Sequence, residues 1–184
     1  MLELENITVL EYINLEDKSD YNFAMKHAKK HYNDAKNVFN INPLDSHSFG
    51  LVKDMQKDFN DNLSWYNLIR YIGKLLDKPM EEVVQFTLLD FCRFKMFVIG
   101  QLKEIIEIES KLLAHTPTDE ELEAGIETFG KFGAFIQLRK LAKEDVTKLE
   151  DVRNMKYSTC LMELIYQKEV YDFQTSLNFI RKPK

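Results

Sequence analysis

The chain has 184 residues and a formal net charge of −5; 45% of its residues are hydrophobic and 12% are aromatic. This length suits one domain with a buried core, and the apolar content excludes a mainly disordered chain because its burial can offset the entropy of ordering. The acidic balance argues against a general affinity for nucleic acid or an anionic membrane, since both require a cationic surface.

The cysteines and the first residues bear on the compartment. Cys92 and Cys160 lack the spacing of a disulfide framework or a zinc site, which favours a reducing environment. The opening MLELENITVLEYINLED is acidic where a signal peptide requires basic residues, and no run approaches the roughly 18 apolar residues of a membrane span. We therefore expect a cytosolic protein that does not contact a membrane.

Apolar residues recur at helical spacing in the first half of the chain. The pattern predicts a long helix between Tyr21 and Phe39, which ends before Pro43 because proline lacks a backbone N–H. It also predicts a helical pair over 49–59 and 65–76, joined by a short turn. The earlier segment NITVLEYI fits either a strand or a helix capped by Asn6.

The clearest helical pattern runs from Asp90 to Leu113. Before it, Asp77 is placed to cap a short helix with Pro79 in its first turn, and we expect a break over 86–89. One apolar stripe runs along a single face of this long helix. It consists of Phe91, Phe94, Val98, Leu102, Ile105, Ile108 and Leu112.

A cluster of glycines follows a predicted helix start. Thr118 and Glu121 form a capping box, which predicts a helix from Asp119 to about Thr128. The glycines Gly125, Gly130 and Gly133 then fall within nine residues. We interpret them as a helix–helix corner, in which the first glycine lets a neighbouring helix approach and the other two supply unusual backbone angles. The corner is expected to turn Phe129, Phe132 and Phe135 into the core.

The last predicted helix, from about Tyr157 to Ile180, is apolar over a wide arc. One patch consists of Cys160, Leu161, Leu164 and Ile165, and an overlapping stripe begins at Met162. The rest of that stripe is the predicted partner-binding surface: Tyr166, Val170, Phe173, Leu177 and Ile180. The alternative is a helix that is buried on two sides.

Together these segments predict an all-α fold, a single-domain irregular helical bundle of about six to eight helices over residues 1–184. Residues 1–42 could instead form an N-terminal helical extension. No sustained alternation of apolar and polar residues supports a sheet, and no internal repeat is visible.

No metal or cofactor site is predicted. His27 and His31 stand four residues apart, but Ala-Lys-Lys lies between them and disfavours a cation, so we interpret them as part of a solvated face. Glu104, Glu107 and Glu109 lack the inward ExxH pairs of a di-iron site and are also assigned to a solvated face, with Glu107 paired to Lys111.

Motifs of catalysis and nucleotide binding are missing, so we do not expect an enzyme. The tripeptide Ser46-His47-Ser48 is interpreted as a cap for the helix that starts at Phe49, and no GxSxG elbow occurs. GKFG, over 130–133, is neither a Walker loop nor a dinucleotide fingerprint. Residues 138–157 outline a helix-turn-helix, but its second helix would place Glu150 and Asp151 near phosphates.

Several stretches together resemble a group of tailed-bacteriophage proteins, the tail assembly chaperone-like proteins. They are the opening LENITVLEYINL, the helix LKEIIEIESKLL with an acidic start to the next helix, and the long segment EAGIETFGKFGAFIQLRKLAKEDVTKLEDVRNMKYSTCLMELIYQKEVYDFQTSL. The resemblance covers about the last two thirds of the chain, and its motifs are packing patterns and not catalytic signatures.

The resemblance implies a non-enzymatic protein that binds a long helical tape-measure protein in the host cytoplasm and covers its apolar seams during tail assembly. One alternative is a structural component of the virion, such as a head, neck or tail ring subunit present as a homo-oligomer. Another is a small helix-turn-helix regulator, although nucleic acid is not an expected partner.

Overall fold

The computed structural model describes residues 6–15, 24–26, 28, 41–60 and 64–181. Over these residues the chain forms helices and turns, and its extended contacts are isolated bridges, Thr8 with Thr87 and Ser48 with Lys156. The all-α prediction is confirmed. Most of the helix predicted between Tyr21 and Phe39, including His27 and His31, lies outside the described residues; 24–26 and 28 are helical.

The internal contacts divide the chain into two compact units. Unit 1 is Met1–His47 with Asp54–Glu104, and unit 2 is Ser48–Lys53 with Ile105–Lys184. Two helices contribute residues to both units, and each unit is described by itself. The assignment of the chain to a single domain stays a prediction.

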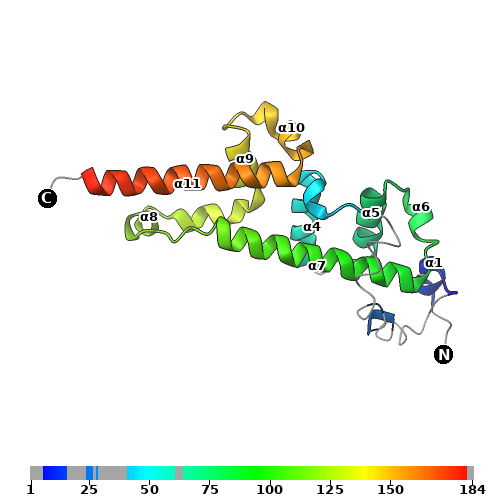
Figure 1. The fold of residues 1–184 in the computed structure, drawn as a ribbon. Helices are drawn as coiled ribbons and strands as arrows, with labels where there is room; N and C mark the ends of the chain where they lie inside the picture. Colours follow the sequence, from blue (N-terminus) through cyan, green and yellow to red (C-terminus); the bar gives the residue numbers. More distant parts are fainter. Residues whose placement is uncertain (1–5, 16–23, 27, 29–40, 61–63, 182–184) are drawn as a thin grey trace. The chain divides into compact units, whose positions relative to one another are not determined.

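Figure 1 shows the helices in chain order, and from α4 onward they follow one another with short connections. The elements up to residue 112 are α1 (Val9–Ile13), the 3₁₀ helix η1 (Leu44–Ser46), α4 (Phe49–Asn60), α5 (Trp65–Leu76), α6 (Met80–Val83) and α7 (Leu88–Leu112). The later elements are α8 (Asp119–Glu123), the 3₁₀ helix η2 (Ile126–Phe132), α9 (Ala134–Leu141), the 3₁₀ helix η3 (Val146–Lys148), α10 (Leu149–Asn154) and α11 (Tyr157–Arg181).

Two capping predictions are wrong. The helix in NITVLEYI is capped by Thr8 and not by Asn6: the Thr8 hydroxyl accepts from the Glu11 N–H, and the Glu11 carboxylate accepts from the Thr8 N–H at 2.8 Å. Asp77 ends α5 in the left-handed conformation, with φ of 53°, and does not start the next helix. Aspartate tolerates this conformation, and the Asp77 N–H bonds the Gly73 carbonyl, so the residue serves the C-terminal end.

Aromatic packing holds the core of unit 1. The Trp65 ring of α5 stacks on Phe91 of α7, with ring centroids 5.1 Å apart, and Tyr12 of α1 packs on the same indole at 5.9 Å. Backbone hydrogen bonds, from the Val9 N–H to the Phe86 carbonyl and from the Leu88 N–H to the Ile7 carbonyl, fix α1 beside the start of α7. The break expected over 86–89 is confirmed only in part: it lies over 84–87, since α6 ends at Val83 and α7 begins at Leu88.

The long helix α7 buries its predicted stripe only in part. The stripe is buried from Phe91 to Ile105, whereas Ile108 and Leu112 are 43% and 46% exposed. In this last part of the helix, Glu109 is the more deeply placed side chain, only 15% exposed. Its assignment to a solvated face is therefore wrong, while Glu107, paired with Lys111 at 2.6 Å, is exposed as predicted.

A buried ionic cluster occupies the core of unit 2. The Lys53 ammonium lies 2.5 Å from Glu109 Oε1, and the Tyr157 hydroxyl donates a hydrogen bond to the same oxygen. Lys53 also lies over the rings of Phe49 and Tyr157, which stack with centroids 5.9 Å apart. Burial lowers the pKa of Lys53, and the Glu109 carboxylate opposes this shift. The cluster joins the first turns of α4, the last turns of α7 and the start of α11.

The glycine corner differs from its prediction. Gly125 and Gly133 have φ of 81° and 49°, but Gly130 is not among the positive-φ residues. A Cβ at Gly125 would meet only Thr128 Cγ2, at 3.9 Å, so the residue is required by its backbone angle and not by a close helix.

The three phenylalanines near the corner are exposed, so their placement in the core is wrong. Phe129, Phe132 and Phe135 are 57%, 46% and 45% exposed. The ring centroids of Phe129 and Phe132 lie 6.4 Å apart. The prediction assumed one helix up to Thr128. The helix instead ends at Glu123, and the left-handed Gly125 starts a 3₁₀ helix whose faces have a different period.

We expect Gly133→Val to lower the free energy of unfolding by about 2 kcal/mol, because a β-branched residue is strained at positive φ. Gly130→Ala is the matched control: this glycine lies inside η2, a Cβ added there would meet nothing within 4 Å, and alanine favours helical geometry. Thermal and denaturant melts measure both variants. Equal losses would contradict a conformational requirement at Gly133.

We expect Glu109→Gln to lower the free energy of unfolding by about 3 kcal/mol, because it leaves the buried Lys53 charge without its carboxylate. Removing that carboxylate also lowers the pKa of Lys53 further below 10.5, so the unfolded state binds more protons and the deficit shrinks as pH rises toward that value.

The control for this prediction is Glu107→Gln, on the same helix but in an exposed pair, which should leave the melting curve unchanged. Denaturant melts of both variants at pH 7 and pH 9.5 provide the measurement. A Glu109→Gln deficit that is absent, or that grows with pH, would contradict the role of the cluster.

Candidate functional site

The predicted partner-binding residues lie on the outer part of α11. This helix is unbroken over its 25 residues, and its buried residues, Tyr157, Cys160 and Leu164, belong to its first half (Figure 1). Tyr166, Phe173 and Ile180 are 64%, 66% and 77% exposed, and Val170 and Leu177 are half-buried. We call these five residues the α11 seam. The second half of α11 is therefore not buried on two sides, as the alternative prediction required.

The α11 seam has the spacing of a coiled-coil strip. Its residues follow one another at intervals of four, three, four and three positions, the heptad pattern that keeps one line of side chains facing a partner helix. Met162 and Phe179, both strongly exposed, widen the apolar surface. Of the positions that flank this strip, Gln167, Gln174 and Ser176 carry no charge. Glu169 and Arg181 are the charged flanking residues. Such a strip can pack against another helix.

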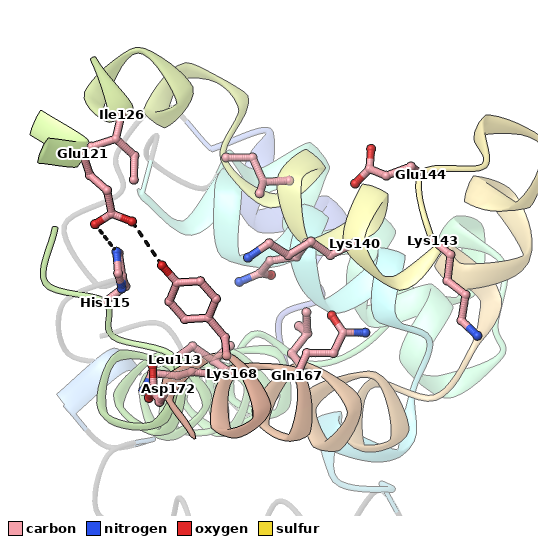
Figure 2. Close-up of a pocket in the computed structure, with 14 residues that line it drawn as sticks. Leu113, His115, Glu121, Ile126, Lys140, Lys143, Glu144, Gln167, Lys168 and Asp172 are labelled. Atoms are coloured by element: carbon pink, nitrogen blue, oxygen red, sulfur yellow. Dashed lines mark hydrogen bonds and ion pairs between the residues drawn. The ribbon is translucent and has the colours of Figure 1, made fainter. Parts of the chain in front are cut away.

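A second feature of unit 2 is a cavity of about 630 Å³ lined by α8, η2, α9, α11 and the segment after α7 (Figure 2). Leu113, Ile126, Ile136 and Leu164 supply its apolar wall. Its size lies within the range of small-ligand pockets, and such pockets combine apolar walls with a few polar groups.

One side of the cavity carries a hydrogen-bonded chain. Glu121 accepts hydrogen bonds from the Thr118 N–H at 2.9 Å and from Tyr171 at 3.4 Å, and its other contact is His115 Nε2 at 2.9 Å. The backbone N–H of Thr118 is the largest cause that lowers the pKa of Glu121, followed by His115. The capping box predicted for Thr118 is thus confirmed, and its glutamate also orders this wall.

The other ionised groups around the cavity differ in their pairing. Lys168 lies 2.5 Å from Asp172, a bond that raises the pKa of Lys168, and Glu144 lies 2.6 Å from Arg139. Among the described residues, Lys140 and Lys143 have no ion-pair partner. Gln137 Oε1, which also lines the cavity, is buried without a hydrogen-bond partner in this part of the chain.

The residues considered for catalysis either cap a helix or are shielded from solvent. Ser48 Oγ accepts from the Leu51 N–H at the start of α4, which confirms the capping interpretation of the tripeptide. Burial lowers the pKa of His47 and raises that of Cys92 to about 12. Cys160 is also buried, and its thiol contacts the Val152 carbonyl at 3.9 Å. A thiol held protonated by burial is a poor nucleophile.

The helix-turn-helix outline corresponds to α9 and α10, with η3 between them. The second helix has only six residues, and Glu150 and Asp151 lie in its first turn. Negative charge at this end of the helix would oppose a nearby phosphate. Within the described ranges, no group of three or more His, Cys, Asp and Glu residues is placed to hold a metal ion.

Sequence reasoning missed the cavity and the ionic cluster. The cavity residues run from Leu113 to Asp172 and come from elements joined only by folding, so their spacing carries no signal. For Glu109, the signal was its position on α7 four residues after the stripe residue Ile105, combined with a lysine on the buried face of α4.

Comparison with protein-family models, with curated proteins and with solved structures finds no match to this chain. Among the helices that the structure describes, none is both long enough and apolar enough to cross a bilayer.

Proposed function

We propose that this protein is a non-enzymatic assembly protein of a tailed bacteriophage, similar to the tail assembly chaperones, and that it binds a helical tape-measure-type partner in the host cytoplasm. The observation that carries the proposal is the exposed α11 seam. A line of aromatic and aliphatic side chains at heptad spacing is suited to a partner with an apolar helical strip.

The composition of the seam supports a binding role. Phe173 and Ile180 each expose most of their side chains to solvent, which is unfavourable for an isolated chain. Covering one such side chain stabilises a complex by about 1.5–3 kcal/mol relative to leaving it exposed. A tape-measure protein has the same difficulty, because its long helices expose apolar strips until the tail tube surrounds them. If the seam packed against such a strip, the apolar side chains of both proteins would be removed from water.

A structural component of the virion is the second candidate. The seam supports it because most of its flanking positions are uncharged, at Gln167, Gln174 and Ser176, which limits repulsion between like charges when copies of one helix pair. Glu169 and Arg181 are the charged exceptions. Finding the chain as a repeated subunit in purified particles would favour this role. Its absence from particles, with recovery of a complex with the tape-measure protein, would favour the chaperone.

DNA binding by the α9–α10 segment is the third candidate. It predicts a salt-sensitive complex that weakens with Arg153→Ala and Lys156→Ala, because each removes one phosphate contact. A gel shift at low salt tests it, and the lack of any shifted band would remove this candidate.

Co-expression with a tape-measure protein, a long coiled-coil protein, tests the leading proposal. We expect the pair to copurify, and we expect Phe173→Asp or Ile180→Asp to reduce recovery of the partner at least tenfold, since each places a charge in an apolar contact. Recovery is measured by affinity purification followed by light scattering of the complex.

The matched control is Tyr66→Asp, which changes an equally exposed aromatic residue on α5. It should leave both the melting temperature and the recovery of the partner unchanged. If the seam variants fold and retain the partner as well as the control does, the α11 seam is not the binding surface.

A further inference from the structure

The cavity of unit 2 offers two polar groups that its own chain does not satisfy. Lys140 is a solvent-exposed lysine with no ion-pair partner among the described residues, and Gln137 Oε1 is buried with no hydrogen-bond donor there. Both residues belong to α9 and lie three positions apart, so they project from neighbouring positions of one helix. Figure 2 shows Lys140 extending from α9 toward the middle of the cavity, whereas Lys143 extends away from the other labelled residues.

We propose that this cavity binds an acylated apolar amino acid, either free or as the C-terminal residue of a peptide. The ligand carboxylate pairs with the Lys140 ammonium. The amide N–H donates to Gln137 Oε1 after this side chain turns toward the cavity, because the oxygen is buried in the unliganded chain. The apolar side chain packs against Leu113, Ile126, Ile136 and Leu164. This site does not depend on the α11 seam, so the inference is independent of the proposed function.

The charge arrangement favours an anion over a cation. The acidic groups of the cavity already have partners: Glu144 has Arg139, Asp172 has Lys168, and Glu121 has the Thr118 N–H together with His115. Lys140 and Lys143 are the ammonium groups of the lining without an ion-pair partner among the described residues, and Lys140 is the one that extends toward the middle of the cavity (Figure 2). A charge-assisted bond to a carboxylate is stronger than one between neutral groups.

The remaining chemistry specifies an amide beside the carboxylate. A buried carbonyl oxygen without a donor costs free energy, and a ligand N–H removes this cost. An acylated amino acid carries an N–H, a carboxylate and an apolar side chain on the same carbon. At about 630 Å³ the cavity also has room for a preceding peptide unit.

Calorimetric titration of the intact chain with N-acetylphenylalanine tests the carboxylate. We expect saturable binding, and about tenfold weaker binding of N-acetylphenylalaninamide, which keeps the N–H and lacks the charge. A tripeptide ending in phenylalanine distinguishes the sources: tighter binding than N-acetylphenylalanine assigns the site to a peptide terminus, and equal or weaker binding assigns it to the free acylated amino acid.

Matched variants test the two side chains. Lys140→Gln should weaken binding of N-acetylphenylalanine about tenfold, while Lys143→Gln, its control on the same rim, should not. Gln137→Met should weaken N-acetylphenylalanine severalfold and leave 3-phenylpropionate unchanged, because that acid has no N–H to donate. Thermal melts verify that all three variants are folded; any that unfolds is replaced by Lys140→Met or Gln137→Leu.

Three results would overturn the proposal. They are the lack of saturable binding at ligand concentrations up to about 10 mM, equal affinity for the carboxylate and the amide, and an equal response of Lys140→Gln and Lys143→Gln. Because the readout is a small molecule and not a protein partner, a failure here leaves the test of the α11 seam unaffected.

Discussion

The fold of unit 2 depends on the charge of Lys53 being held beneath two aromatic rings by the Glu109 carboxylate. A charge this deeply placed is tolerated only when it is paired and hydrogen-bonded, and Tyr157 supplies a further bond to the same carboxylate oxygen. The three residues belong to α4, α7 and α11. The cluster therefore fixes the start of α11, and with it the direction in which the rest of this helix presents its side chains.

Beyond its first turns, α11 contributes residues to two surfaces, the cavity wall and the α11 seam. Leu164, Lys168 and Tyr171 line the cavity at intervals of four and three residues, and the seam begins at Tyr166 with the same intervals. A shift of two residues is about 200° around a helix, so the two lines lie on nearly opposite faces. One helix can thus form the wall of a small-molecule pocket and still leave an apolar strip free for a helical partner.

The two surfaces differ in the kind of recognition they allow. The seam is apolar and repetitive, with few charged flanking residues, so it favours any helix with a matching strip, and its specificity would come largely from register. In the proposed complex the cavity offers an apolar wall, the Lys140 ammonium and the Gln137 amide oxygen, so it would select a ligand by the position of its polar groups. Their chemistry is independent, and each can be tested without the other.

The sequence by itself determined the fold class, the long helices α7 and α11, the capping box at Thr118 and the apolar strip of the seam, because these follow from local spacing and capping. Only the tertiary structure decided that Asp77 ends a helix, that Phe129, Phe132 and Phe135 are exposed, that Glu109 faces inward and that a cavity forms beside Lys140. These features depend on which faces meet across residues distant in the chain. Helical periodicity defines a face, but the neighbour that covers it is chosen by packing.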